Sequence, residues 1–353
     1  MNYRTIYIIL LLFAFVTLLY SFTSENGYFT ITPKDVELKI PKGFPKPVYD
    51  FKQNKITPQG FVLGRKLFYD PILSKDSSIS CASCHQRFAA FAHIDHPISH
   101  GINGLFGKRN VPALQNLIWD NSFMWDGGVN NLEVQPINPI TNPVEMNETL
   151  GHVIYKLQRN TEYADMFKQA FGTDKITSQQ LLKALTQFIG LMVSDNSRFD
   201  KYLRHEDTLS QAEFHGFQVF KSHCANCHAG QLFTDNSYRN TGLKPDTALK
   251  DSGRAAITGL TDDYMKFKVP GLRNVAITYP YMHDGRFRNL KQVINHYSDG
   301  KLYGNYDQSI NKDRGLSETD KADIIAFLNT LTDETFLHDR RFQDPNIYAV
   351  SSK

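Results

Sequence analysis

The chain has little cysteine and almost no excess of charge. Its 353 residues include only four Cys and two Trp, and 39 basic residues nearly balance 36 acidic ones, which leaves a net charge of +3. A protein that binds nucleic acid through its phosphates needs a basic excess or stripe, so this balance argues against such a partner. The 12% aromatic content argues against low-complexity disorder. At roughly 100–200 residues per domain, the length predicts one large domain or two.

An uninterrupted apolar run, Ile6–Tyr20, follows Arg4 near the N-terminus and is itself followed by polar residues. A basic residue before about 7–15 apolar residues is typical of a secretion signal, whereas a membrane-spanning anchor needs about 20. We therefore predict that residues 1–24 form a signal peptide or an N-terminal anchor. The mature chain is expected in the periplasm, either soluble or anchored to the inner membrane by residues 6–20. No Cys stands directly after the run, which excludes a lipoprotein.

The cysteines form two copies of one motif, C-x-x-C-H. The copies are Cys81, Cys84 and His85, then Cys224, Cys227 and His228. In this motif the two thiols form thioethers to a haem, and the adjacent His binds the iron from one face. A redox pair or a Cys-rich zinc site would not explain the His after each pair. Because both copies together use every Cys, the sequence predicts two covalently bound c-type haems rather than disulfides.

The two motifs belong to an internal repeat. Val111–Asn116 is similar to Val269–Asn274, and at the same distance beyond each stands Phe123–Gly127 or Tyr281–Gly285. Such self-similarity at fixed spacing indicates a duplicated haem domain. We place the junction of the two halves near Arg204–Ser210.

The local patterns are helical. Capping residues and apolar residues at spacings of three and four predict helices at Pro58–Phe68, Glu148–Arg159, Glu162–Phe171, Ser178–Val193, from Ser210 to the second motif, and from Ser317 to Leu331. No convincing alternating strand is present. The expected fold class is all-α, with two tandem cytochrome c-like haem domains and long loops. The expected parts are an N-terminal haem domain at 45–205, a C-terminal haem domain at 206–335, and a C-terminal tail at 336–353 that packs on the domains.

Several longer segments resemble the bacterial di-haem cytochrome c peroxidase family, which includes MauG-like di-haem enzymes. They are Leu63–Pro71, Gly107–Pro112, Phe123–Gly127, Asn142–Met146, Phe267–Val275 and Pro280–Gly285. The similarity runs from Pro58 to Thr332. The resemblance implies an enzyme that reduces hydrogen peroxide to water with electrons from a small periplasmic cytochrome c or cupredoxin. It also implies a peroxidatic N-terminal domain, an electron-transfer C-terminal domain and a possible homodimer.

The same resemblance implies three catalytic residues. Glu145 corresponds to the acid–base group opposite the N-terminal haem iron, a role that a positioned carboxylate can perform. Gln135 would help to position peroxide, and Trp125 would carry electrons between the haems. The other Trp, Trp119, is expected to be structural.

The face of the N-terminal haem opposite His85 departs from the family pattern. Many members rest with a His there, but this chain has Ile102 at the matching position and His100 two residues earlier. We therefore expect a haem that is open or weakly closed by His100, active without prior reduction. His93 and His96 stand nearby and are expected to be ordinary loop or surface residues.

The C-terminal haem and a metal site follow from the same comparison. Tyr297 stands where MauG-like members have a Tyr that binds the iron opposite the proximal His, and Met282 is the second choice. A phenolate ligand lowers the haem potential, whereas a thioether raises it. The family's calcium ion would be held by Asn110, Thr278 and Pro280, and oxygen ligands suit this ion.

Two other classes of function stay open. A MauG-like oxidase that acts on a partner protein is favoured by Tyr297. A plain electron-transfer cytochrome is disfavoured by Glu145, because a carrier needs no acid–base group.

Overall fold

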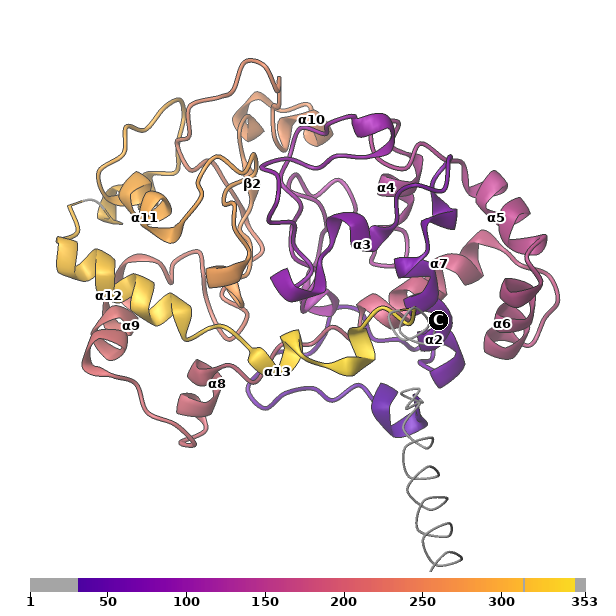
Figure 1. Ribbon diagram of the computed structural model, residues 1–353. Coiled ribbons are helices and arrows are strands. Elements are labelled where there is room, and N and C mark those ends of the chain that lie inside the picture. Colours follow the sequence, from indigo (N-terminus) through magenta and orange to yellow (C-terminus); the bar gives the residue numbers. More distant parts are fainter. Residues whose placement is uncertain (1–30, 314, 347–353) are drawn as a thin grey trace, which may run out of the picture.

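Two helical domains lie side by side in the computed structural model, which describes residues 31–313 and 315–346 (Figure 1). The helices are α2 (Pro58–Tyr69), α3 (Cys81–Cys84), α4 (Ile137–Thr141), α5 (Leu150–Gln158), α6 (Thr161–Phe171), α7 (Ser178–Ile189), α8 (Arg198–Leu203), α9 (Gln211–His223), α10 (Ala255–Thr258), α11 (Leu290–Ser298), α12 (Glu318–Asn329) and α13 (Glu334–Leu337). Two short strands, β1 (Tyr238–Arg239) and β2 (Phe267–Lys268), pair antiparallel. The predicted all-α class with two cytochrome c-like domains is confirmed, and this strand pair is a small addition to it.

The apolar run Ile6–Tyr20 lies outside the described residues. Within the described ranges, every helix is too short or too polar to cross a membrane.

Each domain is organised around one close crossing of helices. In the N-terminal domain α2 packs on α7, and a side chain at Gly64 would begin 2.0 Å from the carbonyl oxygen of Ala184. In the C-terminal domain α9 packs on α12, and a side chain at Gly216 would begin 1.8 Å from the carbonyl oxygen of Asp323. Both glycines are on the helix that leads into a C-x-x-C-H motif. The absence of a side chain there lets the backbones meet and so fixes where each motif begins.

The internal repeat has the same backbone in both copies. Asn116 and Asn274 are both left-handed, with φ of 63° and 59°. Met124 and Met282 share the same conformation, with φ of 67° and 72°. A left-handed conformation is uncommon in residues other than glycine, so its recurrence at matched positions is a specific sign of duplication.

The two copies also exchange equivalent hydrogen bonds across the domain boundary. The backbone N–H of Asn110 donates to the carbonyl of His283 at 2.7 Å. Lys268 stands at the position of Asn110 in the second copy, and its backbone N–H donates to the carbonyl of Trp125 at 2.7 Å. Trp125 and His283 are themselves counterparts, so the contact is reciprocal. The two loops therefore meet in matching positions between the domains.

The C-terminal segment returns to the first domain. Phe336 and Phe342 are buried in the same core as the residues of α2 and α7. The hydroxyl of Tyr69 donates to the carbonyl of Phe342 at 2.6 Å, and the Arg87 guanidinium donates to the carbonyl of Leu337 at 2.8 Å. Figure 1 shows this yellow segment crossing from the C-terminal domain to α2. The N-terminal core is thus completed by the end of the chain.

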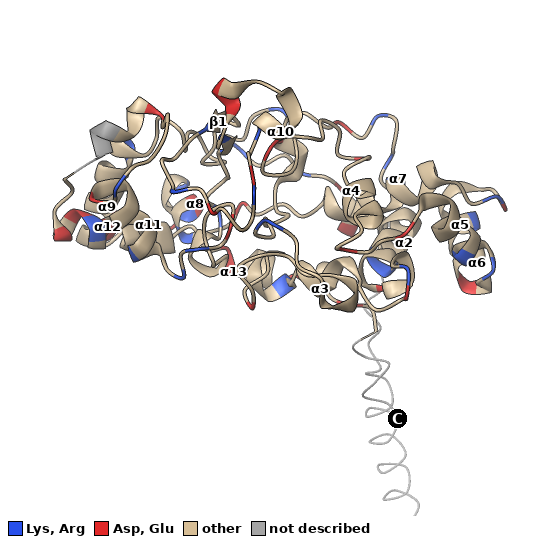
Figure 2. Ribbon diagram, turned by 90° about the horizontal axis from the view of Figure 1, so that it is seen from above, with Lys and Arg blue, Asp and Glu red and all other residues tan. Residues whose placement is uncertain are grey.

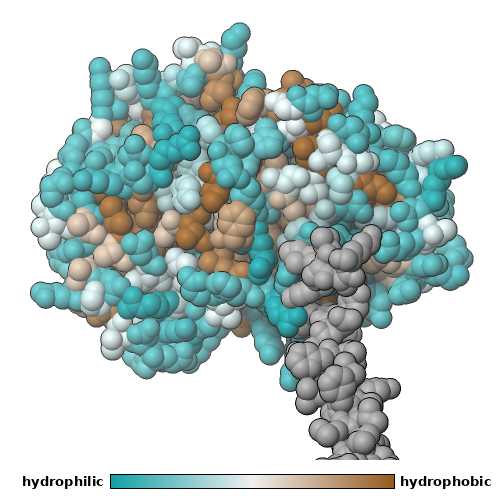
Figure 3. Space-filling view, in the orientation of Figure 1, coloured by the Kyte–Doolittle hydropathy of each residue, from teal (hydrophilic) through white to brown (hydrophobic). Residues whose placement is uncertain are grey.

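Charges of both signs are spread over both domains (Figure 2). On the face shown in Figure 3, apolar residues reach the surface over the C-terminal domain and the middle of the molecule. One ion pair is buried: both terminal nitrogens of Arg273 contact the Asp200 carboxylate at 2.8 Å, and these side chains are 3% and 6% exposed. This pair is therefore shielded from solvent rather than at the surface.

Candidate functional site

Both C-x-x-C-H motifs face one cavity of about 960 Å³ that is lined by residues of both domains. The first motif forms the short helix α3, and in the second Cys224 caps the end of α9. The four Cys are not joined to one another in disulfides. Burial raises the pKa of Cys81 to about 12 and that of Cys84 to about 11. These are neutral thiols on the wall of a large cavity, which suits covalent attachment of a cofactor.

The two motif histidines are prepared to bind a metal through one nitrogen. His85 donates from Nδ1 to the carbonyl of Phe91 at 2.7 Å. His228 donates from Nδ1 to the carbonyl of Phe233 at 3.0 Å. A carbonyl partner on Nδ1 leaves the Nε2 lone pair available to iron. Burial lowers the pKa of His85 to about 4 and lowers that of His228, so both rings are neutral at pH 7. The residues present therefore fit one c-type haem at each motif.

Glu145 lies on the wall of the cavity beside the first motif. Its Oε1 accepts a hydrogen bond from the side chain of Asn142 at 3.0 Å. Burial raises the pKa of Glu145, although the Asn142 bond opposes that shift. The negative charge of Glu145 contributes to the raised pKa of Cys84, which shows how near the carboxyl lies to this motif. Gln135 lines the same cavity.

The loop that contains Gly101 and Ile102 packs against the backbone of Glu145. Ile102 donates from its N–H to the carbonyl of Glu145 at 2.8 Å, and its side chain is only 3% exposed. A side chain at Gly101 would begin 2.3 Å from the Cα of Glu145, so glycine is required for this approach. The preceding residue, His100, lines the cavity. The loop therefore presents His100, rather than the buried Ile102, at the cavity edge.

Trp125 and the three residues expected to bind calcium all line the cavity. The indole Nε1 of Trp125 donates to the carbonyl of Asn110 at 2.9 Å. The Asn110 side chain donates from Nδ2 to the carbonyl of Pro97 at 3.0 Å. Thr278 and Pro280 line the same cavity from the second domain. The three residues expected to bind calcium therefore come from both domains and line one cavity.

Tyr297 and Met282, the two candidate ligands for the second haem, both line the cavity. Tyr297 lies on α11, whose start is capped by the side chain of Asn289. Met282 has the same backbone conformation as Met124, its counterpart in the first half. A conformation common to both halves agrees with a shared packing role for these two methionines.

The domains are also joined by a charged cluster that the sequence did not indicate. The guanidinium of Arg109 contacts both oxygens of Asp251 at 2.6 and 2.8 Å, and it also contacts Asp126. Burial lowers the pKa of Arg109, but the two carboxylates outweigh this and raise it. Arg109 and Asp251 are 142 residues apart, so no local pattern could reveal the pair.

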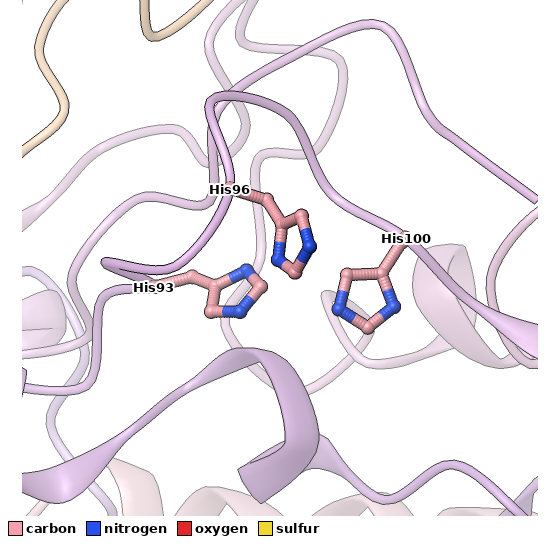
Figure 4. Close-up of side chains that lie close together, drawn as sticks. All are labelled: His93, His96 and His100. Carbon is pink, nitrogen blue, oxygen red and sulfur yellow. The ribbon is translucent and has the colours of Figure 1, made fainter. Parts of the chain in front are cut away.

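A second missed feature is a cluster of three histidines beside the first motif. His93, His96 and His100 lie on one loop with their rings facing one another (Figure 4). His93 is a buried loop residue rather than a surface one, since only 2% of it is exposed. The spacing of three and four residues was a signal, but without a helix it did not establish proximity.

Two haem-attachment motifs in duplicated helical domains, facing one cavity, define a di-haem c-type cytochrome. A family model described as "Di-haem cytochrome c peroxidase" matches residues 58–208, and one described as "Cytochrome c" matches residues 215–332. The chain belongs to the di-haem cytochrome c peroxidase family, and it carries two c-type haems.

The relatives of this chain include two kinds of named protein. The methylamine utilization protein MauG of Methylorubrum extorquens is 35% identical over 88% of each chain. The cytochrome c551 peroxidase of Nitrosomonas europaea is 36% identical over 76% of this chain and 79% of its own. A solved structure, described as a MauG-like protein associated with microbial copper homeostasis, is 31% identical with a TM-score of 0.81 and covers 88% of this chain and 99% of its own. These relatives confirm the predicted family and favour the peroxidase among the functions that the sequence left open.

Proposed function

We propose that this protein reduces hydrogen peroxide to water at the N-terminal haem, using two electrons and two protons for each peroxide. The observation that carries the proposal is Glu145, a buried carboxyl on the cavity wall beside the first motif. When bound there, the haem supplies an iron that can take up peroxide and accept electrons. The chain supplies the second haem site, the path between the sites and the group that moves protons.

The proton chemistry falls to Glu145. As a carboxylate it accepts a proton from one peroxide oxygen, and as an acid it returns that proton to the other, departing oxygen so that water leaves. The hydrogen bond from Asn142 holds Oε1 in place and keeps the carboxylate accessible despite burial. Gln135, on the same wall, can donate a hydrogen bond to the peroxide and orient it.

The electrons are proposed to enter at the C-terminal haem from a small cytochrome c or a cupredoxin. Trp125 lies between the two domains, where it is fixed through Nε1 to Asn110 and through its carbonyl to Lys268. A rigidly held aromatic ring at the boundary is a suitable relay, because little reorganisation accompanies each transfer. Trp125, Glu145 and Gln135 are therefore proposed as the catalytic residues.

Further features complete the proposal. Tyr297 is the proposed iron ligand opposite His228, and Asn110, Thr278 and Pro280, which all line the cavity, are proposed to bind calcium. Residues 1–24 are proposed as a signal or anchor for a periplasmic protein. A homodimer is also proposed, on the family resemblance alone.

The test is the variant Glu145→Gln, which keeps the shape of the side chain and removes its acid–base function. Steady-state oxidation of a reduced small cytochrome c by peroxide should fall about 10²–10⁴-fold, the usual contribution of a positioned proton-transfer group. The control is Glu162→Gln, since Glu162 is largely exposed and remote from the cavity. Haem absorption should be unchanged in both variants. Unaltered turnover in Glu145→Gln would refute the proposed role.

A further inference from the structure

The three histidines beside the first motif form a preorganised ligand set. His93, His96 and His100 each offer a ring nitrogen, and these three nitrogens lie within 4.8 Å of one another. The ring centres are 4.7 to 5.3 Å apart. Figure 4 shows the rings converging from two arms of the loop onto one point. Three such nitrogens around one ion at about 2.0–2.1 Å would stand roughly 3.4 Å apart, so small side-chain rotations suffice to close the site.

Two of these rings have a buried nitrogen with no partner. Nδ1 of His93 and Nδ1 of His96 are inaccessible to solvent and make no hydrogen bond in the described part of the chain. His93 itself is 98% buried, since only 2% of it is exposed. A buried polar atom without a partner costs free energy, about 1–3 kcal/mol, so a native structure that keeps two of them side by side needs an explanation. An ion that accepts both lone pairs provides one.

The charge state of the cluster agrees with this explanation. Burial, followed by repulsion from His100 and His96, lowers the pKa of His93, and burial followed by repulsion from His96 lowers that of His100. Neutral imidazoles are the form that binds metals. The Asp95 carboxylate lies 3.7 Å from Nε2 of His93 and is more than half exposed, so it can balance part of the charge of a bound cation.

We propose that His93, His96 and His100 bind one zinc or copper ion beside the N-terminal haem cavity. Three imidazole nitrogens with a carboxylate or water in the fourth position suit these two ions, whereas calcium and magnesium prefer oxygen ligands. This site is separate from the haem iron, because His93 and His96 do not line the haem cavity and only His100 reaches its edge. It also differs chemically from the proposed calcium residues, which offer oxygen ligands.

The test uses the full-length protein with both haems, stripped with a chelator and then resupplied with calcium. Zinc or copper is added, excess ion is removed by gel filtration, and retained metal is measured per haem by elemental analysis. We expect one zinc or copper ion per chain. His96→Asn and His100→Asn should each weaken binding at least tenfold. The matched control is His205→Asn: His205 is exposed and has φ of 62°, a conformation that Asn tolerates well, so metal binding should not change.

Copper adds a direct view of the ligands. Electron paramagnetic resonance of the copper-loaded protein should show hyperfine coupling to nitrogen that weakens in His96→Asn. The proposal is overturned if no ion is retained, or if both variants bind as tightly as the parent. It is also overturned if a low-spin haem signal disappears in His100→Asn while metal retention does not change, because His100 would then be a haem ligand. Haem absorption and circular dichroism report whether each variant has folded.

Discussion

The backbone N–H of Asn110 donates to the carbonyl of His283 at 2.7 Å, and Lys268, its counterpart in the repeat, donates to the carbonyl of Trp125 at the same distance. Because Trp125 and His283 are also counterparts, the two halves of the molecule are joined by a pair of equivalent bonds. The duplication has therefore produced a matched interface as well as two similar domains. At the centre of this interface the two halves differ, because the first has Trp125 where the second has His283.

This difference predicts a role in electron transfer for the indole of Trp125 that the imidazole of His283 does not share. Trp125→Phe should slow oxidation of the reduced C-terminal haem after mixing with peroxide at least tenfold, because phenylalanine is harder to oxidise and lacks the Nε1 bond to Asn110. Stopped-flow absorption measures this rate. Trp119→Phe is the matched control: Trp119 is buried and donates to the carbonyl of Pro45 at 2.7 Å, so this variant should lose stability but not rate. Equal rates in both variants would remove Trp125 from the electron path.

The pH at which activity is lost in acid should depend on the pKa of Glu145, which its surroundings set. Burial raises the pKa of Glu145 and the bond from Asn142 lowers it, so removing that bond in Asn142→Ala should raise the pKa further. Since the carboxylate form accepts the first proton, activity is lost as pH falls through this pKa. The acid limb of kcat/KM should thus move to higher pH in Asn142→Ala. It should be absent in the double variant Asn142→Ala with Glu145→Gln, and a limb that survives there belongs to another group.

The reduction potential of the C-terminal haem should show whether Tyr297 binds its iron. If the phenolate binds iron, Tyr297→Met replaces it with a thioether and should raise the potential by on the order of 0.1 V, part of the roughly 0.8 V range that axial ligands span. A spectroelectrochemical titration measures the shift. Tyr281→Phe is the control, since Tyr281 also lines the cavity but donates to the carbonyl of Val275 at 2.8 Å. A potential that is unchanged in Tyr297→Met would favour Met282 or an open position.

Stability in acid should depend on the buried pair of Arg273 and Asp200. Burial alone would raise the pKa of Asp200, but the hydrogen bonds from Arg273 and Ser197 outweigh it and hold the pKa below its usual value. A depressed carboxyl pKa stabilises the fold above the unfolded pKa of about 3.9, and this stability is lost as pH falls through the folded pKa.

Removing the Asp200 charge should therefore be costly at neutral pH. Asp200→Asn leaves Arg273 buried and unpaired, and should lower the free energy of unfolding by about 3–5 kcal/mol. Denaturant unfolding at pH 7 measures this. Glu206→Gln is the control, because Glu206 pairs with Arg204 at the surface and its loss should leave stability unaltered. Equal effects of the two substitutions would contradict the importance of burial.

The sequence predicted those parts of the fold that depend on local signals. The helix expected at Pro58–Phe68 is α2 (Pro58–Tyr69), because Thr57 caps it and Pro58 suits its first turn. The helix expected at Ser178–Val193 ends earlier, at Ile189. Gly190 packs against Phe51, where a side chain would begin 2.5 Å from the Phe51 ring, and this distant contact was not visible in the local pattern.

The residues of the site could be predicted where a sequence motif identifies them. They could not be predicted where the fold brings separate segments together. Both C-x-x-C-H motifs could be recognised because residue type and spacing carry the chemistry, and the family resemblance singled out Glu145, which lines the same cavity. The contact of Arg109 with Asp251 and the burial of His93 depend on how loops pass one another. No periodicity encodes such contacts, since the partners come from separate loops or separate halves.

The return of the C-terminal segment to the first domain has a consequence for biosynthesis. Phe336 and Phe342 complete the core that contains Phe61 and Phe91, and they emerge from the ribosome nearly 250 residues after Phe91. The core of the first domain therefore cannot be completed until the end of the chain is available. Loss of the last elements of the chain would open the domain that is made first.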